Sequence, residues 1–123
     1  MTSPTARTLA ECRTRGWLAQ VVERWNPYAR VRVDLFGFID LLACVEGRLL
    51  GIQATTNANA ASRLTKILEH PNAGAWLRTG CELYVWSWGQ YKWRLRSGAW
   101  SRARRWRLTE RRVTLTELRD ATP

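Results

Sequence analysis

The chain of 123 residues is poor in several residue types that carry common chemistries. Its three cysteines, Cys12, Cys44 and Cys81, lie far apart and form no CxxC or Cys/His pattern, which argues against a disulfide framework and a structural zinc site. Histidine occurs once, as His70 before Pro71, and we interpret it as a helix-terminal residue. No Ser/His/Asp arrangement supports a hydrolase triad. The phosphate loops GxxxxGK[ST] and GxGxxG are absent, which argues against a nucleotide-driven motor.

Long apolar runs are also missing from the chain. No stretch approaches the ~18 consecutive apolar residues of a membrane span, and Met1–Pro4 contains no apolar run typical of a signal peptide. We therefore expect a cytoplasmic protein with reduced thiols and no membrane partner. The length predicts a single domain over residues 1–123, and 46% hydrophobic with 24% charged residues predicts a folded chain.

Charge of one sign dominates the sequence. Eighteen arginines and two lysines oppose ten acidic residues, which gives a formal net charge of +10 and a pI of about 11.0. Such a balance is typical of a protein that binds a polyanion. Arginine is well suited to phosphate because its guanidinium fork binds two oxygens at once, although a GC-rich coding sequence would enrich arginine too.

The positive charge is concentrated near the C-terminus. Residues 92–112 contain nine basic residues and one acid, with Trp93, Trp100 and Trp106 between them. Taken singly, each tryptophan is interpreted as a core residue, whereas the block as a whole is interpreted as a nucleic-acid footprint. The residues that we expect to contact nucleic acid are Arg94, Arg96, Trp100, Arg102, Arg104, Arg105 and Arg107.

The pattern of apolar residues and turn signals predicts an α/β fold with a mixed sheet and helices packed on it. Helices are expected at 5–16 and 56–70, with one helical turn within 114–120. Strands are expected at 17–25, 30–45, 48–55, 81–88, 93–96 and 104–111, with turns at Glu46-Gly47, Gly89 and Ser97-Gly98.

The hairpin over residues 30–55 contains the most informative polar residues. A turn centred between Glu46 and Gly47 places Asp40 opposite Gln53 and Phe38 opposite Thr55, so that Asp40, Gln53 and Thr55 share one face. Both Asp40 and Gln53 interrupt apolar runs. Two oxygen-bearing groups at this spacing can share a Mg²⁺ ion, but they can equally well hydrogen-bond to each other as a satisfied buried pair. The residues alone leave both interpretations open.

The stretches Asp34-Leu35-Phe36-Gly37-Phe38-Ile39-Asp40 and Gly51-Ile52-Gln53-Ala54-Thr55, followed by a helix, resemble the PD-(D/E)XK nuclease superfamily. More narrowly, the chain is similar to small phage and bacterial proteins of the Holliday-junction-resolvase-like or VRR-NUC type. The resemblance covers roughly residues 5–90. It implies a restriction-endonuclease-like αβββαβ core, to which residues 91–120 add basic strands.

The resemblance also implies roles for particular residues. Asp40 matches the metal-binding aspartate, and Gln53 matches the acidic or glutamine position of the second motif. Thr55 stands where the catalytic lysine is expected and carries no charge, so Lys66 or Arg63 from the following helix would have to supply the cation.

A further acid would complete such a metal site. Asp34 is in phase with Asp40 and is a candidate for a second metal carboxylate, although Gly37 could break that phase with a bulge. Glu11 and Glu23 are the other candidates, but each has arginine neighbours in the sequence, and we interpret both as members of exposed ion pairs.

The sequence thus predicts a Mg²⁺- or Mn²⁺-dependent DNA endonuclease that cuts branched or single-stranded DNA, and a homodimer if it cuts junctions symmetrically. Asp40 and Gln53, with Asp34, would hold the metal. A catalytically decayed nuclease fold that only binds nucleic acid is the alternative, supported by Thr55 at the lysine position. A structural phage protein or a ribosome-associated protein that uses charge alone is a weaker third possibility.

Overall fold

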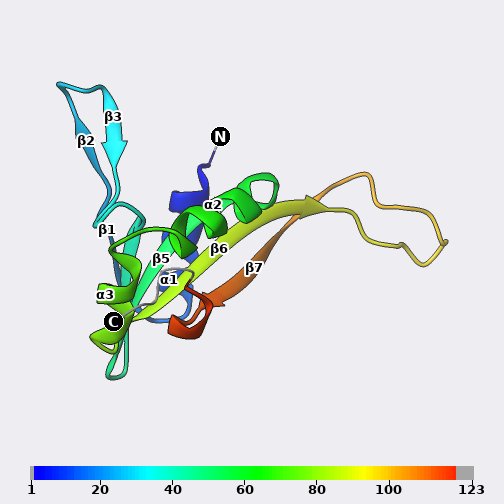
Figure 1. The fold of residues 1–123 in the computed structure, drawn as a ribbon. Helices are drawn as coiled ribbons and strands as arrows, with labels where there is room; N and C mark the ends of the chain where they lie inside the picture. Colours follow the sequence, from blue (N-terminus) through cyan, green and yellow to red (C-terminus); the bar gives the residue numbers. More distant parts are fainter. Residues whose placement is uncertain (1, 119–123) are drawn as a thin grey trace.

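The protein is built around one five-stranded mixed sheet (Figure 1), seen in a computed structural model that describes residues 2–118. The strand order is β1-β4-β5-β6-β7; β5 and β6 are parallel, and the other neighbours are antiparallel. The strands of this sheet are β1 (Leu18–Val21), β4 (Leu41–Val45), β5 (Arg48–Thr56), β6 (Glu82–Tyr91) and β7 (Arg105–Val113). The predicted α/β class with a mixed sheet is confirmed.

The helices cover the two faces of this sheet. They are α1 (Pro4–Thr14), α2 (Ala60–Leu68) and α3 (Ala73–Arg78), with 3-10 turns η1 (Asn57–Asn59) and η2 (Leu115–Glu117). Because side chains alternate along β5 and β6, one core forms under α1 around Ile52 and Trp86, and another forms under α2 and α3 around Ile67 and Val85. Two helices were predicted, and α3 was missed.

The β4–β5 hairpin has the predicted register. Val45 pairs with Arg48 across the Glu46-Gly47 turn, and the ladder ends where Leu41 pairs with Ile52. The predicted pairing of Phe38 with Thr55 is therefore wrong. Before Leu41 the chain bends through a closed turn over 35–39, so β5 continues to Thr56 beside β6 alone.

Two predicted strands are divided in the structure, because the chain leaves the sheet between them. The prediction over 17–25 contains β1 and then β2 (Arg24–Asn26), and the prediction over 30–45 contains β3 (Val31–Val33), the turn and β4. Strands β2 and β3 form a separate two-stranded hairpin, which projects at the upper left of Figure 1.

Strands β6 and β7 continue beyond the helices as a long arm, drawn to the right in Figure 1. The predicted turn at Gly89 is wrong, because Gly89 pairs with Arg107 inside the ladder. The strand predicted at 93–96 is reduced to a single bridge between Arg94 and Trp100, closed by the predicted turn at Ser97-Gly98. The helical turn predicted within 114–120 is present as η2, and residues 119–120 lie outside the described part.

Within residues 2–118 no helix has the length and apolar character needed to cross a membrane. The three cysteines are free, with Cys12 on the buried face of α1 and Cys44 exposed.

Candidate metal centre

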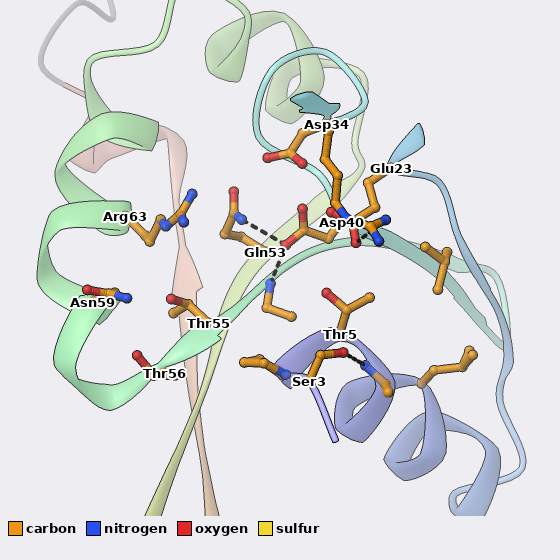
Figure 2. A pocket seen from close by; sticks show the side chains of 16 residues that line it. Ser3, Thr5, Glu23, Asp34, Asp40, Gln53, Thr55, Thr56, Asn59 and Arg63 are labelled. Carbon is orange, nitrogen blue, oxygen red and sulfur yellow. Dashed lines mark hydrogen bonds and ion pairs between the residues drawn. The ribbon is translucent and has the colours of Figure 1, made fainter. Parts of the chain in front are cut away.

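Three carboxylates converge where the β2–β3 hairpin joins the sheet. Glu23 directly precedes β2, Asp34 directly follows β3, and Asp40 directly precedes β4. Their ligand oxygens all lie within 4.8 Å of one another, and Figure 2 shows the three side chains turned toward a common space. The backbone holds this arrangement, because the amides of Val22 and Glu23 both donate to the carbonyl of Asp40, at 2.8 and 3.2 Å.

Asp40 is buried against the edge of β5. Its Oδ2 accepts hydrogen bonds from Gln53 Nε2 at 2.8 Å and from the backbone amide of Ala54 at 2.9 Å. The pairing of β4 with β5 ends at Ile52, before Ala54. The Asp40 side chain therefore satisfies the Ala54 amide, which would otherwise lack a partner. The hydrogen-bonded pair considered from the sequence is therefore present, and the Gln53 oxygen points away from Asp40 (Figure 2).

The electrostatics of the cluster are unfavourable for three charged acids. Burial, together with the neighbouring Asp34 carboxyl, raises the pKa of Asp40 to about 8, although the Ala54 amide acts in the opposite direction. The only ion pair within the cluster, among the described residues, joins Glu23 to Arg32 at 3.8 Å. Crowded carboxyls of this kind favour a divalent cation, and carboxylate oxygens are the ligands preferred by Mg²⁺ and Mn²⁺.

The cluster faces an open cavity of about 660 Å³. Thr55 lines it from β5 and is only 4% exposed, and Arg63 reaches it from α2 (Figure 2). Lys66 lines a neighbouring cavity of about 250 Å³, whose walls share Asp34, Gln53 and Arg63 with the first. Of the residues predicted for catalysis or metal binding, Asp34, Asp40, Gln53, Thr55 and Arg63 thus meet at one cavity, with Lys66 next to it.

Three further residues considered from the sequence, Glu11, Glu23 and His70, lie in different surroundings. Glu11 forms an ion pair with Arg15 at 2.9 Å, as predicted. The interpretation of Glu23 as an exposed partner is wrong, because its side chain is 13% exposed and belongs to the acidic cluster. Glu23 was one of the acids considered from the sequence to complete the site, but no spacing favoured it over Glu11. His70 follows the C-terminal end of α2 and packs against Phe38, in agreement with a helix-terminal role.

The arm presents the predicted nucleic-acid residues at the surface. Trp100 and Trp106 are 56% and 39% exposed and Trp93 is half-buried, so the interpretation of each as a core residue is wrong. Trp93 and Trp100 follow the end of β6, in the part of the arm outside the sheet, whereas the ring of Trp106 packs against the guanidinium of Arg7 in α1, 3.6 Å from the ring centroid. The six arginines predicted to contact nucleic acid are all exposed: Arg94, Arg96, Arg102, Arg104, Arg105 and Arg107.

Several of these arginines stack on aromatic rings. The guanidinium carbon lies 4.1 Å from the Trp100 ring centroid for Arg94, and 3.8 Å from that of Trp93 for Arg105. Arg107 stacks on Tyr91 in the same way, at 3.9 Å. Stacking of this kind orders a long side chain without neutralising its charge.

Comparison of the chain with models of known protein families, with curated proteins and with solved structures returned no match in any of the three.

Proposed function

We propose that this protein is a metal-dependent DNA endonuclease of the PD-(D/E)XK type, which acts on branched or other structured DNA. The observation that carries the proposal is the convergence of Glu23, Asp34 and Asp40 within 4.8 Å at an open cavity that also contains Arg63. Three hard oxygen donors beside a cation suit the hydrolysis of a phosphodiester.

The order of elements supports the same proposal. Apart from the inserted β2–β3 hairpin and the short helix α3, the elements from α1 to β6 follow the αβββαβ order of the superfamily that the sequence resembles, and β6 is parallel to β5. Asp40 stands at the start of β4 and Gln53 near the end of β5, which are the positions of the two motifs in that superfamily.

Each residue would have a defined task. Glu23, Asp34 and Asp40 would hold Mg²⁺ or Mn²⁺, with the Gln53 oxygen as a further candidate ligand. The bound ion would make water more acidic and stabilise negative charge on the phosphate. Arg63 would bind a phosphate oxygen and replace the charge missing at Thr55, while Lys66 would act from the adjoining cavity.

The arm would bind the DNA backbone away from the cavity. Its arginines are exposed and several are ordered by stacking, which suits contacts with a row of phosphates. If the enzyme cuts junctions symmetrically, two copies would act together as a homodimer.

The test is cleavage of a synthetic four-way junction and of a single-stranded oligonucleotide with Mg²⁺, with Mn²⁺ and with EDTA. We expect cleavage that depends on the metal and is lost in Asp40→Ala, while DNA affinity measured in EDTA stays close to that of the wild type. Glu11→Ala is the matched control, because it removes an acid outside the cluster. Full activity in Asp40→Ala would contradict the proposal.

The alternative is a decayed nuclease fold that only binds nucleic acid. Two observations favour it: Thr55 replaces the motif lysine, and the Gln53 amide nitrogen already donates to Asp40. Retention of DNA without any product, equal with metal and with EDTA, would support this alternative and exclude the enzyme.

A further inference from the structure

The β2–β3 hairpin projects from the rim of the acidic cavity. It begins one residue after Glu23 and ends one residue before Asp34, so both of its ends supply a carboxylate to the cluster. Its two strands are antiparallel, with Trp25 opposite Arg32. Whatever binds to this hairpin next to the sheet is therefore close to the cavity.

One face of the hairpin is turned toward the cavity. Arg32 lines the cavity and lies 3.8 Å from Glu23. Directly opposed residues of an antiparallel pair lie on the same face, so Trp25 shares this face with Arg32. Arg24 is one residue away and lies on the opposite face.

The aromatic rings of the hairpin are exposed and uncovered. Trp25 is 56% exposed and Tyr28, at the tip, is 97% exposed. Among residues 2–118 no guanidinium or second ring stacks on either of them, in contrast to the rings of the arm. The segment 24–33 contains three arginines and no acid. Free rings beside cations are suited to unpaired nucleotides, whose bases stack and whose phosphates are negative.

We propose that the cavity-facing side of the β2–β3 hairpin binds unpaired nucleotides of DNA, with a base stacked on Trp25 and the adjacent phosphate held by Arg32. The substrate class is then DNA that has a single-stranded segment next to the bond that is cut. The part of this proposal that concerns the cut bond rests on the proposed function. The binding itself requires neither metal nor cleavage.

The experiment measures binding in EDTA by fluorescence anisotropy, with a blunt DNA duplex and with the same duplex carrying a single-stranded overhang. The wild type is expected to prefer the overhang by about tenfold, since one base stacked on an aromatic ring contributes that much or more. Trp25→Ala should lose this preference and keep its affinity for the blunt duplex. Trp25→Phe should retain most of the preference, because a ring is still present.

Two matched controls separate stacking from general effects. Leu18→Ala removes another exposed apolar side chain, 75% exposed, from an edge strand outside the hairpin, and it should leave the preference unchanged. Arg32→Gln should weaken binding to the overhang more than Arg24→Gln, which removes the same charge from the other face of the hairpin.

Three results would overturn the proposal: a wild type without preference for the overhang, an unchanged preference in Trp25→Ala, or an equal loss in Leu18→Ala. Sedimentation of wild type and Trp25→Ala adds another outcome. If the substitution abolishes self-association and leaves the overhang preference intact, the hairpin is an interface between copies of the chain. Failure of metal-dependent cleavage would remove the endonuclease and leave this binding result standing, so the two proposals fail separately.

Discussion

The two β-hairpins that project from the domain are both rich in arginine and aromatic residues, yet they present them differently. In the β6–β7 arm, Arg94, Arg105 and Arg107 lie over aromatic rings. In the β2–β3 hairpin the rings of Trp25 and Tyr28 have no such cover among the described residues. Similar composition therefore produces one surface that orders cations for phosphates and another that leaves rings available for bases.

At Trp25 the difference involves the acidic cluster. Trp25 is paired directly with Arg32, and this guanidinium would be well placed to stack on the ring. Instead it lies 3.8 Å from Glu23, a member of the acidic cluster. In the arm, the tip region 92–104 contains no acid, and Arg94, Arg105 and Arg107 stack on aromatic rings.

The largest expected effect is on stability. It compares a glycine in the turn over 35–39, which follows the β2–β3 hairpin, with a glycine at the tip of the arm. Gly37 has φ +96°, and a Cβ added there would clash with the His70 ring. Gly98, at the arm tip, has φ +86° and open space around it. Gly37→Ala should lower the free energy of unfolding by about 3 kcal/mol, because alanine is disfavoured in the left-handed region and its Cβ would also overpack this site. Gly98→Ala has only the first of these penalties and should lower it by about 1 kcal/mol. Thermal unfolding measures both variants, and equal losses would contradict the expected clash between residue 37 and the His70 ring.

The next effect separates the two hairpins by their response to salt. Replacing Arg104, Arg105 and Arg107 with alanine should reduce the slope of log affinity against log salt by up to about 3, because each lost phosphate contact contributes about 0.9. Trp25→Ala should leave this slope unchanged. Titration of a DNA duplex at several salt concentrations measures it. An unchanged slope in the triple variant would remove the arm from the DNA interface.

The smallest effect concerns the pH dependence of stability. The pKa of Asp40 is raised to about 8 in the folded protein, from an ordinary value near 3.8. Between these values the folded state holds a proton that the unfolded state has lost, so stability falls as the pH rises from about 4 to about 8. Asp40→Asn should remove this decline, and we expect a gain of about 1–2 kcal/mol at pH 8.

Glu117, near the foot of the arm, is a control because its pKa is shifted in the opposite direction to that of Asp40. Arg111 lowers the pKa of Glu117 to about 2, so its contribution to stability is complete above about pH 4.5 and is lost as the pH falls toward 2. Glu117→Gln should therefore lower stability without changing its slope between pH 5 and pH 8. Urea unfolding at a series of pH values measures both variants, and a wild-type stability that rises over this range would contradict the raised pKa of Asp40.

The β4–β5 hairpin was predictable because its signals are local. A two-residue turn at Glu46-Gly47 sets the register, and alternation then sets which residues share a face. The hydrogen bond between Asp40 and Gln53 follows from these two facts. The turn at 35–39 was not predictable in the same way, because Gly37 allows either a bulge or a reversal, and its packing against His70 made the reversal the stable choice.

Position along the chain does not reveal how far a strand extends past its covering helices. Trp93, Trp100 and Trp106 have the apolar character of core residues. Only the structure shows that Trp93 and Trp100 follow the end of β6, outside the sheet, and that the ring of Trp106 packs against the guanidinium of Arg7 in α1. The same limit applies to Trp17–Trp25, where β-forming residues continue without a break although the chain leaves the sheet after Val21.

The sequence by itself determined the net charge of +10, its concentration near the C-terminus and the position of Asp40 beside Gln53, because composition and local strand pairing need no knowledge of distant contacts. Only the tertiary structure decided that Glu23 and Asp34 join Asp40. These two acids are separated along the chain by the whole β2–β3 hairpin, and they meet because its strands pair and return the chain to its starting point.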